Sequence, residues 1–298
     1  IPMALLIQAE SVIMFYADYR ALWWFVLALF VIAIILVRTG IRLFNREEIL
    51  SREMDELHIK FIWRDFWGYF LRPPELAGQR SNTVAARFSL PRFYRHDIPL
   101  LLRQQRSALL VILLAVAASA VFGVMFARQY PVPDGAFSLE GLTAETFQSL
   151  ENVPFMPSIT TPAIFINNLR VIILAALVSV FSFGALVLFL TLINLGLVSF
   201  IIAEVTAIGL NPWLFVAAFI LPHGILEIPA IIIGMAFALR IGAVMMSPPD
   251  GLDVGQALLL TLANFVKILV FVIVPLLLLA ATIEANITPH IVLAVYGR

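Results

Sequence analysis

His223 and Glu227 are two ionisable residues in a place where charge is costly. They are the only titratable residues between positions 205 and 239, in an otherwise apolar stretch. Their i, i+4 spacing puts both side chains on one face of a helix, one turn apart. An ionisable group inside a membrane needs a partner or a wet cavity, which makes the pair a candidate functional site.

Three kinds of chemistry suit this pair. Imidazole and carboxylate are both metal ligands, and Glu204 in the neighbouring apolar segment is a candidate third ligand. The same residues could relay protons or contact a substrate. The favoured interpretation is an interhelical hydrogen-bonded pair that fixes packing, because no HExxH motif or second nearby histidine completes a ligand set. We therefore expect no metal, no other cofactor and no catalytic residues. If a metal does bind, His223 and Glu227 are the candidate ligands.

Lys267 completes the candidate polar cluster of Glu204, His223, Glu227 and Lys267. It is either a counter-charge to Glu204 or Glu227, or a lysine whose ammonium group reaches the cytoplasmic interface along its apolar stem. The second interpretation is slightly favoured.

Two prolines and a glycine shape the segment that carries the pair. Pro222 and Pro229 lack an N–H and are expected to bend the helix. Gly224 is expected to allow close approach of a neighbouring helix.

Composition assigns the chain to the polytopic membrane proteins. Of its 298 residues, 62% are hydrophobic and only 13% are charged, which is too apolar for a soluble domain. The formal net charge of zero indicates no nucleic-acid partner. The lack of cysteine excludes disulfides and thiolate metal sites.

The uncharged runs predict an all-α transmembrane bundle of about six spans. The run at 171–203 is too long for one span, so a tight hairpin is expected near residues 194–196. The predicted crossings cover residues 21–37, 107–127, the two arms of 171–209, 212–241 and 256–283.

The distribution of charge predicts the orientation. Thirteen of the nineteen Lys and Arg residues lie between Arg38 and Arg106, which places this segment on the cytoplasmic side of the membrane. Loop 129–168 has four acidic residues and no Lys or Arg, as expected of the other side. Aromatic residues at helical spacing in 59–70 predict an amphipathic interfacial or packed cytoplasmic helix that stops at Arg72-Pro73-Pro74.

Several motifs together resemble the stage II sporulation protein M family over residues 98–290. The specific part is Leu221-Pro222-His223-Gly224 followed by Glu227-Ile228-Pro229-Ala230. The family-motif residues are Asn167, Asn168, Arg170, Asn194, Pro222, His223, Gly224, Glu227, Pro229 and Glu284. Residues 19–60 also resemble the C-terminal end of an ABC-type exporter permease, which would make Ile1 an internal position of a longer chain.

These resemblances imply a non-enzymatic membrane subunit of a cell-envelope complex, linked to an ABC-type exporter or to envelope remodelling. They also imply a multi-pass protein of the cytoplasmic (inner) membrane of a prokaryote. The implied partners are membrane or envelope proteins, a cytoplasmic ATPase and the lipid bilayer, in a hetero-oligomer or homo-oligomer. The alternatives are an intramembrane metal-dependent hydrolase or a proton-coupled transporter that uses Glu204, His223 and Glu227. The expected domains are an N-terminal segment at 1–60, a cytoplasmic helix and linker at 61–97, and a five-span membrane domain at 98–298.

Overall fold

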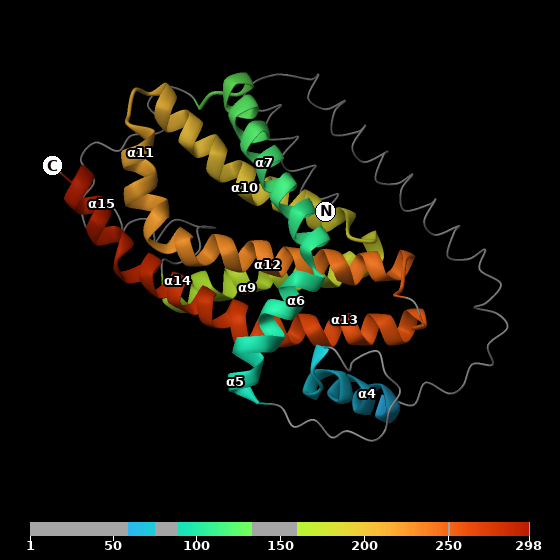
Figure 1. The fold of residues 1–298 in the computed structure, drawn as a ribbon. Coiled ribbons are helices and arrows are strands. Elements are labelled where there is room, and N and C mark those ends of the chain that lie inside the picture. Colours follow the sequence, from blue (N-terminus) through green and yellow to red (C-terminus); the bar gives the residue numbers. More distant parts are fainter. Residues whose placement is uncertain (1–58, 75–88, 133–159, 250, 298) are drawn as a thin grey trace. The chain divides into compact units, whose positions relative to one another are not determined.

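A computed structural model of the protein describes residues 59–74, 89–132, 160–249 and 251–297 (Figure 1). Contacts group Lys60–Arg298 into one compact unit, and the description below concerns this unit. Its regular structure is helical throughout the described residues. The predicted crossing at 21–37 lies outside them.

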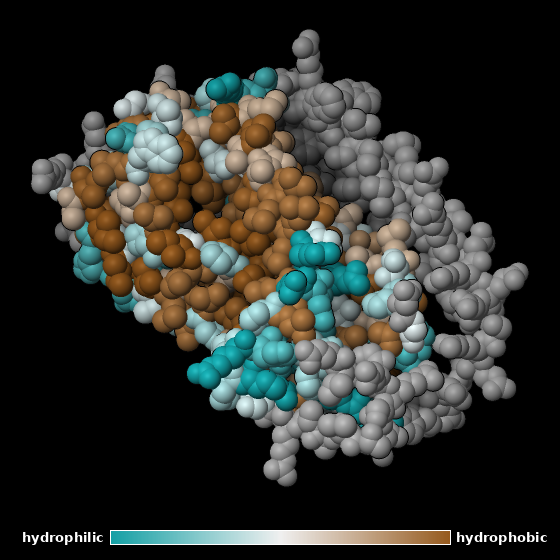
Figure 2. Space-filling view, viewed as in Figure 1, coloured by the Kyte–Doolittle hydropathy of each residue, from teal (hydrophilic) through white to brown (hydrophobic). Residues whose placement is uncertain are grey.

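Within the described residues, five helical segments are long and apolar enough to cross a membrane, which confirms the polytopic helical bundle. Their bounds are Arg106–Gln129 (α7), Thr161–Ser182 (α9), Ala185–Ala207 (α10), Pro212–Met246 and Val254–Tyr296. In Figure 2 apolar atoms cover the middle of the visible face, while hydrophilic atoms gather over α5 (Leu90–Arg92) and α6 (Ile98–Gln104) and at the far end of α7. This pattern suits an apolar belt between two polar boundaries.

The central helix of the bundle is α12, Leu221–Met246, which contacts α7, α9, α10, α13 and α14. Its second half is the most buried part, and Met235, Phe237 and Ala238 have no exposed surface. Small residues make this possible. A Cβ on Gly242 would collide with the backbone of Gly184 and Ser179. The backbone of α12 is therefore in direct contact with the backbone around the turn between α9 and α10.

Wide π-helical turns precede three prolines. They are η2 (Phe93–Asp97) before Pro99, η3 (Val216–Ile220) before Pro222, and η4 (Leu269–Ile273) before Pro275. A proline cannot donate to the carbonyl four residues earlier and clashes with it, and a π turn relieves both problems locally. The predicted bend at Pro222 is therefore a π turn, whereas α12 continues through Pro229.

The fourth and fifth crossings are built in pieces around these turns. The fourth consists of α11 (Pro212–Phe215), η3 and α12. The fifth consists of α13 (Val254–Ile268), η4, α14 (Val274–Asn286) and α15 (Thr288–Tyr296). Asn211 and Asp253 cap the first turns of α11 and α13 by accepting hydrogen bonds from backbone N–H groups.

The hairpin predicted near residues 194–196 is wrong, because α10 runs without a break from Ala185 to Ala207. The chain turns instead at Phe183 and Gly184, whose φ angles are 53° and 89°. Glycine adopts this left-handed conformation at little cost, and it allows the reversal after α9. Asn194 and Gly196 lie within α10, where Gly196 packs against Gly123 of α7.

The predicted amphipathic helix is confirmed as α4, Ile59–Leu71, which ends just before Arg72-Pro73-Pro74. Its aromatic side chains contact one another, and Phe70 also contacts Phe271 of the fifth crossing. Trp63 is 62% exposed, as expected of an interfacial residue.

Candidate functional site

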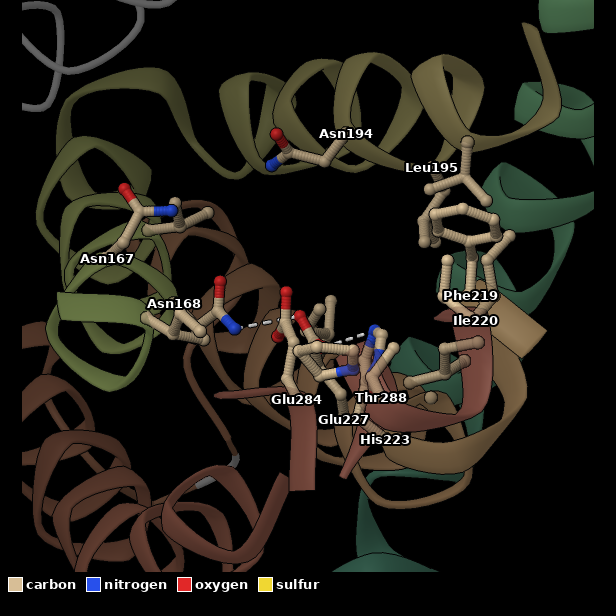
Figure 3. Close-up of a pocket in the computed structure, with 18 residues that line it drawn as sticks. Asn167, Asn168, Asn194, Leu195, Phe219, Ile220, His223, Glu227, Glu284 and Thr288 are labelled. Atoms are coloured by element: carbon tan, nitrogen blue, oxygen red, sulfur yellow. Dashed lines mark hydrogen bonds and ion pairs between the residues drawn. The ribbon is translucent and has the colours of Figure 1, made fainter. Parts of the chain in front are cut away.

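A cavity of about 490 Å³ lies where α9, α10, α12, α14 and α15 meet (Figure 3). Its walls are mainly apolar, but polar side chains from all five helices reach it. They are Asn167, Asn168, Asn194, His223, Glu227, Glu284 and Thr288. All but Thr288 belong to the family-motif residues identified in the sequence.

His223 and Glu227 form the floor of the cavity as neighbours on α12. The Nε2 atom of His223 lies 3.7 Å from Oε2 of Glu227, as the i, i+4 spacing predicts. Both side chains are largely buried, with 13% and 17% of their surfaces exposed. The start of α12 at the proline after η3 therefore sets where the pair lies.

Each member of the pair has a partner on another helix. The Nδ2 amide of Asn168 donates a hydrogen bond of 2.9 Å to Oε1 of Glu227. On the other side, Nδ1 of His223 lies 3.4 Å from Oγ1 of Thr288. These contacts tie α12 to α9 and to the start of α15, in line with the predicted interhelical hydrogen bonding.

Glu284 of α14 joins this pair from a third direction. One ligand atom each from His223, Glu227 and Glu284 lies within 4.8 Å of the other two. The three side chains meet in Figure 3, with Asn194 across the cavity from them. One imidazole and two carboxylates at this spacing can hold a cation or share a proton.

Gly224 has a different role from the one expected. The atoms nearest to a Cβ added there belong to Ile220 and Ile228 of its own chain segment, at 3.4 and 3.5 Å. Gly224 lines the cavity. The close helix approach predicted for it occurs further along α12, at Gly234 and Gly242.

Glu204 lies apart from His223 and Glu227. Its Oε2 accepts a hydrogen bond of 3.0 Å from the backbone N–H of Val132, and it lines a second hollow beside Arg128 and Pro131. The predicted grouping of Glu204 with the α12 pair is not assembled in the structure.

Lys267 also lies away from the cavity, near the end of α13. Its ammonium group donates a hydrogen bond of 3.0 Å to the carbonyl of Arg72, directly after α4. The charges of Asp97 and Arg92 are close enough to interact electrostatically with this ammonium group. Only 1% of the surface of Lys267 is exposed, so its ammonium group is buried against the carbonyl of Arg72 and pairs with neither Glu204 nor Glu227.

Three family-motif residues do not line the cavity: Arg170, Pro222 and Pro229. Pro222 acts indirectly through the π turn before it. The residue that reasoning from sequence missed as a member of the polar cluster is Glu284. The feature of the sequence that could have indicated it is its position as a single acidic residue at the end of the long apolar run after Lys267.

The sequence model of the family Stage II sporulation protein M matches residues 108–289. Neither the curated proteins nor the solved structures contain a match to this chain.

Proposed function

We propose that this chain, which belongs to the stage II sporulation protein M family, is a non-enzymatic membrane subunit of a cell-envelope complex. The proposal includes its place in the inner membrane of a prokaryote and a link to an ABC-type exporter or to envelope remodelling. Its partners are other membrane or envelope proteins, with a cytoplasmic ATPase supplying any energy.

The observation that carries the proposal is the convergence of the family-motif residues on one cavity. Asn167, Asn168, Asn194, His223, Gly224, Glu227 and Glu284 come from four helices and line the same space. Packing alone does not require polar groups of four helices to border a space of this size. Buried polar groups that destabilise a fold are commonly retained for function.

The cavity offers a partner both donors and acceptors. Asn167 and Asn194 present amides, while the carboxylates of Glu227 and Glu284 present acceptors. A polar group from a partner segment, placed here, would be shielded from lipid and hydrogen-bonded on several sides. Such a contact gives specificity, because a partner without that group leaves the cavity groups unpaired.

The test is the double variant His223→Leu/Glu227→Leu in the full-length protein. We expect it to insert and fold, because two leucines suit an apolar helix, but to lose partner co-purification and complementation of a deletion strain. Size-exclusion chromatography and thermal melting in detergent report on folding separately from assembly.

A matched control replaces two other polar residues by leucine outside the cavity, as in Thr206→Leu/Thr282→Leu. Both threonines are exposed, and the hydroxyl group of each donates to a backbone carbonyl of its own helix. This control is expected to assemble and complement as the wild type does. Full complementation by a stable His223→Leu/Glu227→Leu protein would reduce the cavity to a packing feature.

A further inference from the structure

We infer that His223, Glu227 and Glu284 form a binding site for a divalent transition-metal ion, with zinc as the representative ion. This inference rests on the side chains of the cavity and does not depend on the proposed complex. Four features support it: the ligand set, the charge of the cavity, the groups that hold the ligands in place, and the space beside them.

The ligand set is complete once Glu284 is included. A zinc ion that keeps an open position uses three protein ligands, and one histidine with two carboxylates provides three donors of suitable type. Their ligand atoms lie within 4.8 Å of one another, while zinc bonds are about 2.0–2.2 Å long, so binding would draw the side chains slightly together. The donors come from α12 and α14, and an ion would therefore join these two helices.

The charge of the cavity favours a cation. Glu227 and Glu284 bring two carboxylates together, and the described residues that line the cavity include no Lys or Arg. Two close carboxylates in a membrane-spanning bundle repel each other unless a proton or a cation lies between them. One divalent ion compensates both.

The groups behind the ligands hold them in position for an ion. Asn168 donates to Oε1 of Glu227, and Oε2 of the same carboxylate faces His223. A proton on Nδ1 of His223 can be donated to Oγ1 of Thr288, which leaves the lone pair of Nε2 directed at Glu227. Metal-binding histidines generally donate their second ring N–H in this way.

The histidine also narrows the class of ion. Calcium and magnesium prefer sites made of oxygen ligands only, whereas imidazole favours zinc and its transition-metal neighbours. The cavity of about 490 Å³ leaves room for a water molecule or a ligand of a partner at the open coordination position. An ion in this site could therefore bind a further ligand as well as join the two helices.

The first experiment uses full-length protein purified in detergent, treated with a chelator and titrated with Zn²⁺. We expect about one zinc ion per chain. The variants His223→Gln, Glu227→Gln and Glu284→Gln should each bind at least tenfold more weakly, because losing a direct ligand costs at least as much as the roughly 10–100-fold loss on removing a group behind a ligand. The control His290→Gln changes an exposed histidine on α15 outside the cluster and should bind as the wild type does.

A second measurement needs no variant. Co²⁺ added to chelator-treated wild-type protein should give the visible absorption of a four-coordinate nitrogen and oxygen site, and Zn²⁺ should abolish that absorption. The inference is overturned if wild-type protein binds no zinc, if the Co²⁺ spectrum is that of the hydrated ion, or if Glu284→Gln binds zinc with unchanged affinity. Absence of zinc binding would instead assign a shared proton to the two carboxylates.

Discussion

Lys267 shows what a buried charge contributes at the scale of one residue. Only 1% of its surface is exposed, yet its ammonium group reaches the carbonyl of Arg72 and the field of Asp97, which is itself 1% exposed. A cation next to the carbonyl that follows a helix is favourable, and a buried carboxylate needs a counter-charge. Lys267 therefore connects α4 and the fifth crossing.

We predict that Lys267→Met lowers stability by about 1–3 kcal/mol, because the variant leaves the partly buried carbonyl of Arg72 without its donor and removes a positive charge near the buried Asp97. Thermal melting in detergent measures the loss. Adding Asp97→Asn should recover part of it, while Arg95→Met, a change to an exposed cation, should have little effect. A Lys267→Met protein that melts with the wild type would contradict this role.

The residues of the candidate site were predictable from the sequence in type but not in grouping. His223 and Glu227 share one helix, so their spacing alone predicts their contact. Glu284 is 57 positions from Glu227 on another helix, and only tertiary packing determines that they meet, whereas Glu204 faces a different hollow. The sequence provides no measure of which faces of two helices come together.

At the scale of helices, the contact between α7 and α10 depends on Gly123. A Cβ at this position would overlap the backbone of Gly196 and Phe200, and no side-chain movement can relieve a clash with backbone. The two helices consequently pack at the close distance that small residues allow.

We predict that Gly123→Ala lowers stability by about 1–3 kcal/mol through overpacking, despite the better helix propensity of alanine. The matched control is Gly68→Ala on α4, where an added Cβ has nothing within 4 Å and should be neutral or stabilising. Melting temperatures of both variants test this. Equal or higher stability of Gly123→Ala would show that the α7 and α10 backbones separate readily.

Helix class was predictable from apolar run length, whereas the hairpin position was not. An uncharged run of more than thirty residues contains a turn that no charge marks, and Asn194 and Gly196 are the type of residues that favour turns. The chain turns instead at Phe183 and Gly184, where close packing of Gly242 against Gly184 stabilises the reversal. A phenylalanine with φ of 53° is not a signal that sequence patterns reveal.

At the scale of the whole molecule, the crossings determine which ends share a side of the membrane. Each crossing carries the chain from one side of the membrane to the other, so the direction of the chain alternates from one crossing to the next. The end of α12 therefore lies with the start of α7, while the end of α7 lies with α15.

We predict that single cysteines at Gln104 and Ser247 are labelled from one face of the membrane and those at Gln129 and His290 from the other. All four side chains are exposed, and the wild-type chain has no cysteine to remove. The positive-inside rule assigns the first pair to the cytoplasm. Labelling of Ser247→Cys and His290→Cys from the same face would overturn the arrangement of the last two crossings.

The π turns η3 and η4 have a geometric consequence for the cavity. Each turn directly precedes a helix that carries ionisable side chains of the cavity. His223 and Glu227 follow η3, and Glu284 follows η4. A π turn beside a proline has fewer regular hydrogen bonds than α-helix, and helices kink at such places. Both crossings therefore change helix type ahead of these side chains, and the wall of the cavity includes Phe219 and Ile220 of η3. We expect the bends at these turns to set the angle at which α12 and α14 bring His223 and Glu284 together.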